Sequence, residues 1–529
     1  MTQRVPHESP LQKNKNDFKT LITPTQISLR SFHKKHSSLN SNCGVFGIAN
    51  HPEAAIMTYY GLHSLQHRGQ EAAGIVSCEA TNEKDKYRFN IHKEHGLVLS
   101  VFNEDILTDV LKGNSAIGHT RYSTTGASDK RTNIQPFKVN YKSGNLALSH
   151  NGNLTNTKAL RDSLQDDGTL FQTTTDSELI LHLIARSKES AVEDKIKDAF
   201  SKVEGAYSIC ILTDTKLIAV RDPHGVRPFC VGILDGKSHI FTSETCALDI
   251  INAEYLREVQ PGEMIVVDTS GKNNNPESYQ LKSLKKYHHC IFEYVYFSRP
   301  DSEVFGEKVD KVRRRIGKSL ALQSPPPFKS PEDKKRVVII NVPDSSNTAT
   351  LGYFTESIKH NQDIKNEIGL IRSHYVGRTF IQPGQDKREM KVRTKFNIVK
   401  GVLAERKVVI VDDSIVRGTT SKLLVGLIKK AKPKEIHMKI TSPPVVSPCY
   451  YGMDFPSKEE LIANKHSQDI NKIKAELLVD ELSYLSCENL LSAVPYSKPE
   501  TGYCTACFTG NYPIPIEETG EMNKENFDD

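Results

Sequence analysis

Two adjacent carboxylates, Asp412 and Asp413, follow an apolar and mostly β-branched run at residues 407–411. Such a run predicts a buried strand of a parallel sheet, and open α/β sheets bind ligands at the carboxyl ends of their strands. A loop that could cradle a phosphate with its backbone N–H groups and hydroxyls then leads into a predicted helix at residues 422–430. The loop contains Ser414, Arg417, Gly418, Thr419, Thr420 and Ser421. Carboxylates beside a phosphate cradle suit a ribose 5-phosphate; the alternative is an ordinary strand–turn–helix with a capping Asp.

A second hydroxyl-rich loop, containing Ser345 and Ser346, follows the strand-like run RVVIINV. A plain structural turn is the alternative interpretation of this loop. Further along, residues 374–389 are rich in Gly, Pro and charge, which is typical of a mobile lid over a ligand. Arg378 on this lid could reach a diphosphate.

Cys43 lies at the front edge of the first strand-like segment, directly after a polar and basic stretch at residues 1–42. Packing in a core is the commonest role of a free cysteine. The alternative is a nucleophile, because several later segments could together bind and hydrolyse glutamine. The first of these is a Gly-rich turn, QHRGQEAAG, which contains Gly69.

Three polar segments carry further groups that glutamine hydrolysis needs. Arg121, in HTRYST, could grip an α-carboxylate with both arms of its guanidinium. Asn151 and Gly152, in SHNGNL, could donate hydrogen bonds to an oxyanion. Asp176, at the start of a predicted helix, could accept a hydrogen bond from an α-ammonium. Each segment is weak alone, and their order after Cys43 carries the hypothesis.

Four of the ten cysteines raise the question of a metal centre. Cys504 and Cys507 form a C-x-x-C, which alone could be a zinc half-site, a redox pair or neither. Cys246 lies in SETCALD and Cys449 in SPPVVSPCYYG. Apart from Cys43, the other cysteines lie in apolar contexts and are interpreted as core residues: Cys78, Cys210, Cys230, Cys290 and Cys487.

Two patterns of secondary structure must position these groups. From residue 43 to about 270, strand-like segments are interspersed with helical ones at 54–66, 177–188 and 192–203, which predicts a mixed α+β domain. From about residue 335 the strands RVVIINV, EIGLIRS, KVVIVDD and EIHMKITS alternate with helices, which predicts a parallel sheet with βαβ crossovers.

The composition excludes several classes of protein. A chain of 529 residues allows two or three domains. The excess of six Lys and Arg over Asp and Glu is mild and does not argue for nucleic acid as a partner. The chain has no apolar run long enough for a membrane helix. Ten cysteines are too few for a disulfide-stapled secreted protein, so a reducing compartment is favoured.

The DDSIVRGTT loop resembles the 5-phosphoribosyl 1-diphosphate (PRPP) loop of type I phosphoribosyltransferases. The segments after Cys43 resemble class II glutamine amidotransferases of the N-terminal-nucleophile type. With EYVYFSRPDS at 293–302 as a link, the order of motifs from about 43 to 515 is similar to the amidophosphoribosyltransferases that carry an iron–sulfur cluster. The resemblance implies a four-layer αββα glutaminase domain at 43–285, an α/β type I phosphoribosyltransferase domain with a parallel sheet at 286–480, and a C-terminal segment with the C-x-x-C and a mobile acidic tail at 481–529.

The resemblance also implies the chemistry. Cys43 would form a thioester with glutamine, with Asn151 and Gly152 holding the oxyanion and Arg121, Asp176 and Gly69 binding the substrate. Ammonia would pass internally and displace pyrophosphate from C1 of PRPP, giving 5-phosphoribosylamine in the first step of purine synthesis. PRPP would contact Ser345, Arg378, Asp412, Asp413, Ser414 and the cradle from Arg417 to Ser421. One Mg²⁺ per subunit would be held by Ser346, Asp412 and Asp413, and a [4Fe–4S] cluster by Cys246, Cys449, Cys504 and Cys507, with zinc as the alternative.

Two differences from the family's usual pattern are visible, and further properties follow from the resemblance. The family's Lys-Asn-Arg before the lid reads Arg372, Ser373 and His374 here, so the third position loses its permanent cation. In addition, Cys43 is not the first residue, although the family's nucleophile uses its own α-amine as the base. We therefore expect cleavage before Cys43. Purine nucleotides are expected as feedback inhibitors and a homotetramer as the assembly, with neither nucleic acid nor membrane as a partner.

The segment 1–42 contains seven Lys or Arg and only two acidic residues, and it is rich in Ser. This composition predicts a disordered propeptide or leader of a cytoplasmic enzyme. It fits equally a transit peptide to a plastid or mitochondrion. Two rival functions fit the chain less well: another glutamine amidotransferase would lack the DDSIVRGTT loop, and a PRPP-sensing regulator would have no use for Cys43 and the glutamine-binding segments together.

Overall fold

The computed structural model of the protein describes residues 43–83, 86–122, 131–273, 275–327, 336–360, 362–373, 395–496 and 498–516. Three predictions fall outside these ranges: the cleavable segment 1–42, the lid with Arg378, and the acidic tail from 517 onward. Among the helices of the described ranges, none combines the length and the apolar character that crossing a membrane requires.

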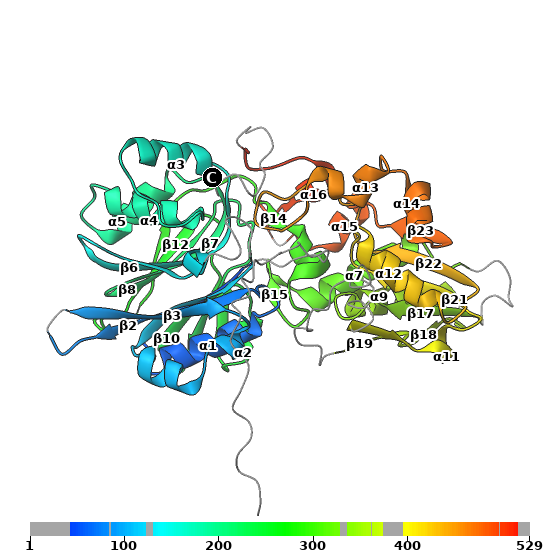
Figure 1. Ribbon diagram of the computed structural model, residues 1–529, viewed down its shortest axis with the longest axis horizontal. Helices are drawn as coiled ribbons and strands as arrows, with labels where there is room; N and C mark the ends of the chain where they lie inside the picture. The colour runs from blue at the N-terminus through cyan, green and yellow to red at the C-terminus, as the bar shows by residue number, and fades with distance from the viewer. Residues whose placement is uncertain are drawn as a thin grey trace, which may run out of the picture. The chain divides into compact units, whose positions relative to one another are not determined.

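The first half of the chain forms two antiparallel sheets that lie face to face (Figure 1). The first sheet has the order β11 (Glu254–Glu258), β9 (Cys230–Leu234), β10 (Ser238–Thr242), β1 (Gly44–Ile48), β4 (Ser115–Arg121), β2 (Ala72–Ala80), β3 (Tyr87–His95). The second has the order β13 (Glu277–Gln280), β12 (Glu263–Asp268), β8 (Lys216–Arg221), β7 (Gly205–Thr213), β6 (Gly144–Leu154), β5 (Phe137–Tyr141). Strand β1, which follows Cys43, is therefore central in its sheet.

Helices cover the outer face of each sheet and complete four layers. The first sheet carries α1 (Ala54–Ser64), α2 (Val98–Val101) and α6 (Cys246–Asp249), and the second carries α3 (Thr157–Asp166), α4 (Ser177–Arg186) and α5 (Val192–Phe200). Between the sheets, apolar side chains such as Val45 and Ile117 pack against Ala147 and Leu212. Strands β1 and β7 are buried along their whole length, because each lies between a facing sheet and a helical layer. The predicted αββα sandwich is confirmed.

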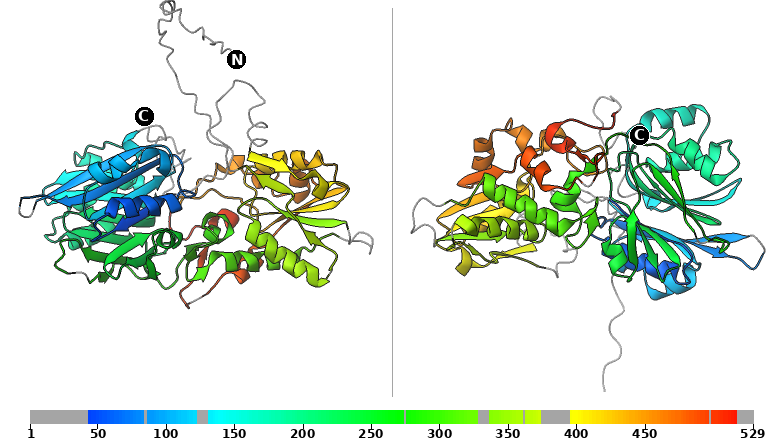
Figure 2. Two further views of the ribbon diagram at one scale, coloured as in Figure 1. Left: turned by 90° about the horizontal axis from the view of Figure 1, so that it is seen from below. Right: turned by 180° about the vertical axis from the view of Figure 1, so that it is seen from behind.

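The second half contains the predicted parallel sheet. Its order is β18 (Lys365–Asn366), β17 (Val337–Asn341), β21 (Lys407–Asp412), β22 (Glu435–Ile440), β23 (Glu481–Tyr484). Helices α7 (Val309–Gln323) and α9 (Asn347–His360) pack on one face, and α12 (Thr419–Lys429) and α14 (Ile470–Leu477) on the other (Figure 2). All six residues of β21 are buried, as its continuous apolar pattern predicts.

Two details of the sequence-based prediction are wrong. The run EIGLIRS does not form a strand of the parallel sheet; its last residues form β19 (Leu370–Arg372), which pairs with β20 (Phe396–Ile398) in a separate antiparallel ribbon. The parallel sheet instead uses the two-residue β18 just before it. Helix α12 begins at Thr419, three residues earlier than predicted, because Gly418 in the left-handed conformation already starts the turn.

Short elements connect the two halves. Strand β14 (His289–Cys290) pairs in parallel with β24 (Tyr503–Cys504), which brings the C-terminal segment against the link.

The remaining short elements are spread along the chain: η1 (Ile106–Val110), η2 (Arg131–Asn133), η3 (Glu293–Phe297), β15 (Glu303–Val304), β16 (Glu307–Lys308), α11 (Lys400–Leu403), η4 (Lys458–Glu460), α13 (Ile462–Lys465), α15 (Cys487–Ala493) and α16 (Ala506–Thr509).

A buried network of ion pairs also spans the link. The guanidinium of Arg68 contacts Glu244 and lies 2.6 Å from the Glu293 carboxylate, and Arg227 lies 3.3 Å from the same carboxylate. All four side chains are fully buried. Removing one member would leave an uncompensated buried charge, which costs about 3–5 kcal/mol in comparable cases. The network therefore ties the loop containing Gly69 to η3.

Candidate functional site

Cys43 is buried at the start of β1, beside the end of β4. Gly44 lies opposite Thr120, so the thiol is next to the last residues of β4, and its S–H donates to the Tyr122 carbonyl oxygen at 3.4 Å. Burial raises the pKa of Cys43 to about 11. A thiol with this pKa is a weak nucleophile at neutral pH, so it needs a base at hand.

Charged groups from three segments surround this thiol. Arg121, the last residue of β4, lowers the pKa of Cys43, whereas the carboxylates of Glu71 and Asp176 raise it. The loop before Glu71 packs against the same strand end, since a Cβ on Gly69 would lie 2.6 Å from the Thr120 carbonyl carbon. The structure thus brings together four residues that the sequence analysis selected: Cys43, Gly69, Arg121 and Asp176.

Asn151 and Gly152 lie on β6, in the facing sheet. The Asn151 side-chain amide donates to Ser243 Oγ at 3.4 Å, and the same oxygen accepts from the Val45 backbone N–H at 3.0 Å. This serine links the amide to the strand that carries Cys43. Gly152 has a φ of +150°, and a Cβ there would lie 1.9 Å from the Ala206 carbonyl oxygen. Only glycine fits this position, because it has no Cβ and tolerates a positive φ.

The Asp176 carboxylate is held by two donors and is nearly inaccessible to solvent. Its Oδ2 accepts from the Leu154 backbone N–H at 2.9 Å, and its Oδ1 accepts from Ser177 Oγ at 3.1 Å. Leu154 ends the strand of Asn151 and Gly152, so the acid is fixed relative to the oxyanion candidates.

The second candidate site lies where β17 and β21 end side by side. The two strands are parallel neighbours with Asn341 opposite Val411, so the loops after them meet. Ser346 Oγ donates to Asp412 Oδ1 at 3.2 Å, and Ser345 Oγ donates to Asp413. The peptide between Pro343 and Asp344, in the same loop, is cis.

The two aspartates in this site are buried against each other. Burial, followed by the neighbouring Asp413 carboxylate, raises the pKa of Asp412 well above its usual value. Burial also raises the pKa of Asp413, although hydroxyls and the Arg313 guanidinium oppose the shift. Arg313 is itself buried, and it donates to the Tyr294 and Ser298 carbonyl oxygens at 2.7 and 2.8 Å. The arrangement favours binding of a cation between the two carboxylates.

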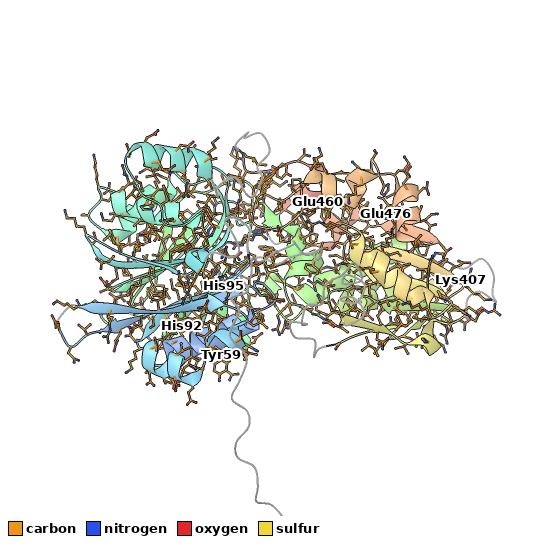
Figure 3. The ribbon with its side chains drawn as sticks, in the orientation of Figure 1. Tyr59, His92, His95, Lys407, Glu460 and Glu476 are labelled. Atoms are coloured by element: carbon orange, nitrogen blue, oxygen red, sulfur yellow. The ribbon has the colours of Figure 1, made fainter. Side chains whose placement is uncertain are left out.

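The predicted phosphate cradle opens α12. Gly418 is the N-cap with a φ of +76°, and no side chain caps the first N–H groups of this helix. Thr419, Thr420 and Ser421 are its first residues, and they are followed by more than two helical turns. Arg417 lies just before Gly418 and forms an ion pair of 2.5 Å with Glu460. Figure 3 labels Glu460 and also Lys407, the first residue of β21. The start of α12 therefore lies close in the chain to Asp412 and Asp413, as the loop sequence predicts.

Cys246 does not lie with the other cysteines selected from the sequence, and this part of the prediction is wrong. It begins α6 and packs in the core under α1, where its thiol faces the Ser64 carbonyl oxygen at 4.0 Å and Glu244 at 3.9 Å. Burial raises its pKa to about 12. Cys246 is therefore a core residue.

Cys290 is buried in a core, as predicted, and it lies beside the C-x-x-C. It is opposite Cys504 in the β14–β24 pair, and burial, followed by the Cys504 and Cys290 thiols, raises the pKa of Cys507. Cys449 also contributes to this shift. The Val446 and Ser447 N–H groups donate to the Cys507 carbonyl oxygen at 2.9 and 3.1 Å, which holds the loop of Cys449 against the C-x-x-C.

Over the residues that the structure describes, no three His, Cys, Asp or Glu side chains stand in an arrangement that could hold a metal ion. The donor chemistry can still be compared with the expected groups. Cys449 Sγ accepts from the Tyr451 N–H at 3.4 Å, and Cys290 and Cys449 raise the pKa of the buried Arg227 against the effect of its burial. An N–H donor and a guanidinium are partners that thiolates favour.

Comparisons with known proteins agree with this two-site arrangement. A family model described as a glutamine amidotransferase domain matches residues 119–249. The chain is 45% identical over 482 residues to an amidophosphoribosyltransferase of Bacillus subtilis (strain 168), covering 90% of this chain and 95% of that protein. It is 47% identical over 472 residues to the chloroplastic amidophosphoribosyltransferase 1 of Arabidopsis thaliana, covering 89% and 78%. The chain belongs to the amidophosphoribosyltransferase family.

Solved structures agree with this family. The B. subtilis glutamine PRPP amidotransferase in complex with ADP and GMP superposes with a TM-score of 0.80 at 44% identity, covering 90% of this chain and 98% of that one. The structure of an allosteric regulatory enzyme of purine biosynthesis also gives a TM-score of 0.80, at 43% identity. Like the rest of the family, the protein is a glutamine-dependent pentosyltransferase that catalyses the first step of purine biosynthesis.

The sequence analysis missed several residues of the two sites. Ser243, Ser177 and Glu71 contact or influence the glutamine half, and Arg313 the phosphoribosyl half. A signal existed for Cys290, because it stands three residues before Glu293, where the recognised link EYVYFSRPDS begins. Buried serines carry no such signal, since one hydroxyl in an apolar strand or helix start has no pattern of its own.

Proposed function

We propose that Cys43 is the nucleophile that releases ammonia from glutamine. Its sulfur attacks the side-chain carboxamide carbon, the C–N bond breaks, and a thioester and ammonia form; water then hydrolyses the thioester to glutamate. Asn151 and Gly152 stabilise the oxyanion, while Arg121 binds the α-carboxylate and Asp176 the α-ammonium of glutamine. Gly69 lets the adjoining loop approach the substrate.

The released ammonia then attacks C1 of PRPP, breaks the bond to the diphosphate oxygen and yields 5-phosphoribosylamine and pyrophosphate. Asp412, Asp413 and Ser414 lie at the ribose, and the residues from Arg417 to Ser421 hold the 5-phosphate. Ser345 contacts the diphosphate, and Arg378, which is not among the described residues, is assigned to it as well.

One observation supports this function most directly. Arg121, Asp176 and Glu71 lie close enough to the buried Cys43 thiol for their charges to shift its pKa. A test replaces Cys43→Ala and measures pyrophosphate release from PRPP with glutamine and with ammonia. Glutamine-dependent release should fall by at least about 10³-fold, and ammonia-dependent release should persist. Cys78→Ala, at another buried cysteine of the same sheet, is the control and should keep both reactions.

Mg²⁺ would be held by Ser346, Asp412 and Asp413, one ion per subunit. The raised pKa values of the two buried carboxylates support this assignment, because burial destabilises the charge on both, the Asp413 carboxylate adds to the effect on Asp412, and a divalent cation would offset it. When bound, the ion would supply positive charge to the phosphate oxygens, which favours departure of the diphosphate. Loss of this ion should stop the glutamine- and ammonia-dependent reactions alike.

A [4Fe–4S] cluster would be held by Cys449, Cys504 and Cys507 together with Cys290 in place of Cys246. The support is the set of four thiols with a guanidinium and an N–H donor beside them. Its role would be structural, joining the tail to the link. Iron analysis of anaerobically purified Cys290→Ser against Cys246→Ser tests this: iron should be lost only from the first variant. Zinc and no iron in the unmodified protein would favour the Cys₄ zinc alternative.

Cleavage between Asn42 and Cys43 would supply the base that the Cys43 thiol needs. Its pKa of about 11 leaves little thiolate at neutral pH, and a new α-amine on the same residue could accept the proton. Mass spectrometry of the native protein should find Cys43 as the first residue. Fully active enzyme with residues 1–42 intact would contradict the propeptide.

Further properties of the family extend this proposal. Purine nucleotides would bind as feedback inhibitors, which the ADP and GMP complex of the B. subtilis relative supports. A homotetramer, the domain limits 43–285, 286–480 and 481–529, and a cytoplasmic location remain parts of the hypothesis. The plant relatives named chloroplastic support the alternative that residues 1–42 address the protein to a plastid.

A further inference from the structure

Ser177, the first residue of α4, is completely buried and contacts three polar side chains through one hydroxyl. Its Oγ accepts from Gln135 Nε2 at 3.3 Å and lies 2.9 Å from His150 Nδ1. The same hydroxyl donates to Asp176 Oδ1 at 3.1 Å. A serine side chain therefore stands at the centre of a polar cluster that solvent does not reach.

The bonding capacity of this hydroxyl is filled. A serine offers one proton and two acceptor lone pairs. Because a carboxylate only accepts and the Gln135 amide donates, the hydroxyl donates to Asp176 and accepts from Gln135; the direction of its contact with His150 Nδ1 is set by the tautomer of that imidazole. The hydroxyl then has no free rotation, and it presents its proton to one carboxylate oxygen only.

The cluster joins the strand that carries the oxyanion candidates to the Asp176 carboxylate. His150 directly precedes Asn151 and Gly152 on β6, and its backbone N–H donates to Gln135 Oε1 at 2.7 Å. Asp176 receives the Leu154 N–H from the end of the same strand. Gln135, His150 and Asp176 are 7%, 2% and 4% exposed. Their hydrogen bonds therefore lie in a low dielectric, where such bonds hold geometry most firmly.

We propose that Ser177 is a positioning residue for glutamine recognition. It fixes the Asp176 carboxylate in the orientation that receives the substrate α-ammonium, and His150 and Gln135 fix Ser177 relative to the oxyanion strand. This inference rests on the proposed function, which assigns the ammonium to Asp176. Ser177 itself does not touch substrate, so it acts on the affinity for glutamine and not on the chemical step.

The test is Ser177→Ala in the native enzyme, purified after expression of the whole chain. The KM for glutamine should rise about 10-fold, in line with a lost hydrogen bond to a charged group, while kcat changes by less than about twofold. Ser187→Ala, at a buried serine just after the other end of α4, is the matched control and should leave the KM unchanged. Equal losses in kcat and in the ammonia-dependent reaction would overturn the proposal.

Inhibition by substrate-like acids separates positioning from general damage. Glutamate carries the α-ammonium and glutarate lacks it, so Ser177→Ala should weaken inhibition by glutamate about 10-fold and leave inhibition by glutarate unchanged. Equal weakening of both inhibitors would overturn the proposal. If the alanine variant fails to fold, Ser177→Cys keeps the volume with a weak donor and should give an intermediate KM; an unchanged KM would contradict the inference.

Asp176→Asn distinguishes this inference from the function on which it rests. If that variant keeps the normal KM for glutamine, the ammonium is bound elsewhere and the assignment of Asp176 fails. If Asp176→Asn loses glutamine binding but Ser177→Ala does not, only the positioning role of Ser177 fails.

Discussion

The two candidate sites differ in how many acidic side chains they bury together. Asp176 in the glutamine half receives a backbone N–H and a serine hydroxyl whose own partners are complete. Asp412 and Asp413 in the phosphoribosyl half are buried beside each other, and the pKa of each is raised. Serine hydroxyls donate to the acids of both sites, but the phosphoribosyl half also buries two neighbouring carboxylates. The glutamine half thus holds one acid ready for a single ammonium, whereas the proposed Mg²⁺ would bind the paired acids of the other half.

Exchanging an acid for its amide in each half should separate the two sites most clearly. Asp412→Asn should lower pyrophosphate release from PRPP by about 10²–10³-fold with either glutamine or ammonia, because the cation site is lost. Asp176→Asn should lower kcat/KM for glutamine by a similar factor and leave the ammonia-dependent reaction intact. Steady-state rates with each nitrogen source check this; a loss of both reactions in Asp176→Asn would show that the halves are not separable.

Thermal unfolding should report how the buried carboxylates of Asp412 and Asp413 affect the stability of the protein. The folded state holds protons on Asp412 and Asp413 more tightly than the unfolded chain, so the free energy of unfolding falls as pH rises from about 4 through the raised pKa values. The proposed Mg²⁺ would relieve the ionised pair, so it should raise Tm more at pH 8 than at pH 5. Asp413→Asn should raise the Tm at pH 8 without Mg²⁺, by about 2–4 °C for each kcal/mol relieved, and should reduce the response to Mg²⁺.

A Tm that responds equally to Mg²⁺ at both pH values would contradict this account of the pair. Asp176→Asn is the control variant, because its carboxylate lies in the other half. Its response to Mg²⁺ should equal that of the unmodified protein at each pH.

Two glycines in and next to α12 test the role of the backbone in the proposed phosphate cradle. At Gly418 φ is +76°, and a new Cβ would lie 2.3 Å from Ile462 Cδ1. Gly418→Ala should therefore destabilise the protein by about 1–2 kcal/mol. Gly426 lies in the exposed middle of the helix, and apart from its chain neighbours and the backbone of its own helix no atom lies within 4 Å of a new Cβ. Gly426→Ala should stabilise the protein by up to about 1 kcal/mol. Denaturant unfolding measures both changes, and a weaker affinity for PRPP is expected only in Gly418→Ala.

The phosphoribosyl half was predictable because its signal is local. In β21, the loop and α12, the strand, carboxylates and cradle follow one another without interruption, and hydrophobic period and turn chemistry describe such a unit. The αββα sandwich came from the resemblance carried by short motifs around Cys43. Neither source could locate β18, whose two residues are shorter than any periodic pattern.

The partners of single buried side chains were not predictable. The sequence analysis selected Cys246 as a cluster ligand and assigned Cys290 to a core, and the pairing of β14 with β24 is what brings Cys290 beside Cys504. Ser177 follows an aspartate that was recognised, but its role depends on Gln135 and His150, which come from distant segments. Such contacts depend on tertiary packing, which one sequence does not encode in a readable local pattern.

The β14–β24 pair has a consequence for the order in which the protein is made. Cys290 meets Cys504, a residue synthesised much later, near the end of the chain. Domains fold as they leave the ribosome, the first ones first, so the glutaminase sheets can form while the link is still unpaired. This attachment of the C-terminal segment to the link forms only when synthesis is nearly finished. A truncated chain that ends before Tyr503 therefore lacks this closure, however well its two earlier sheets have folded.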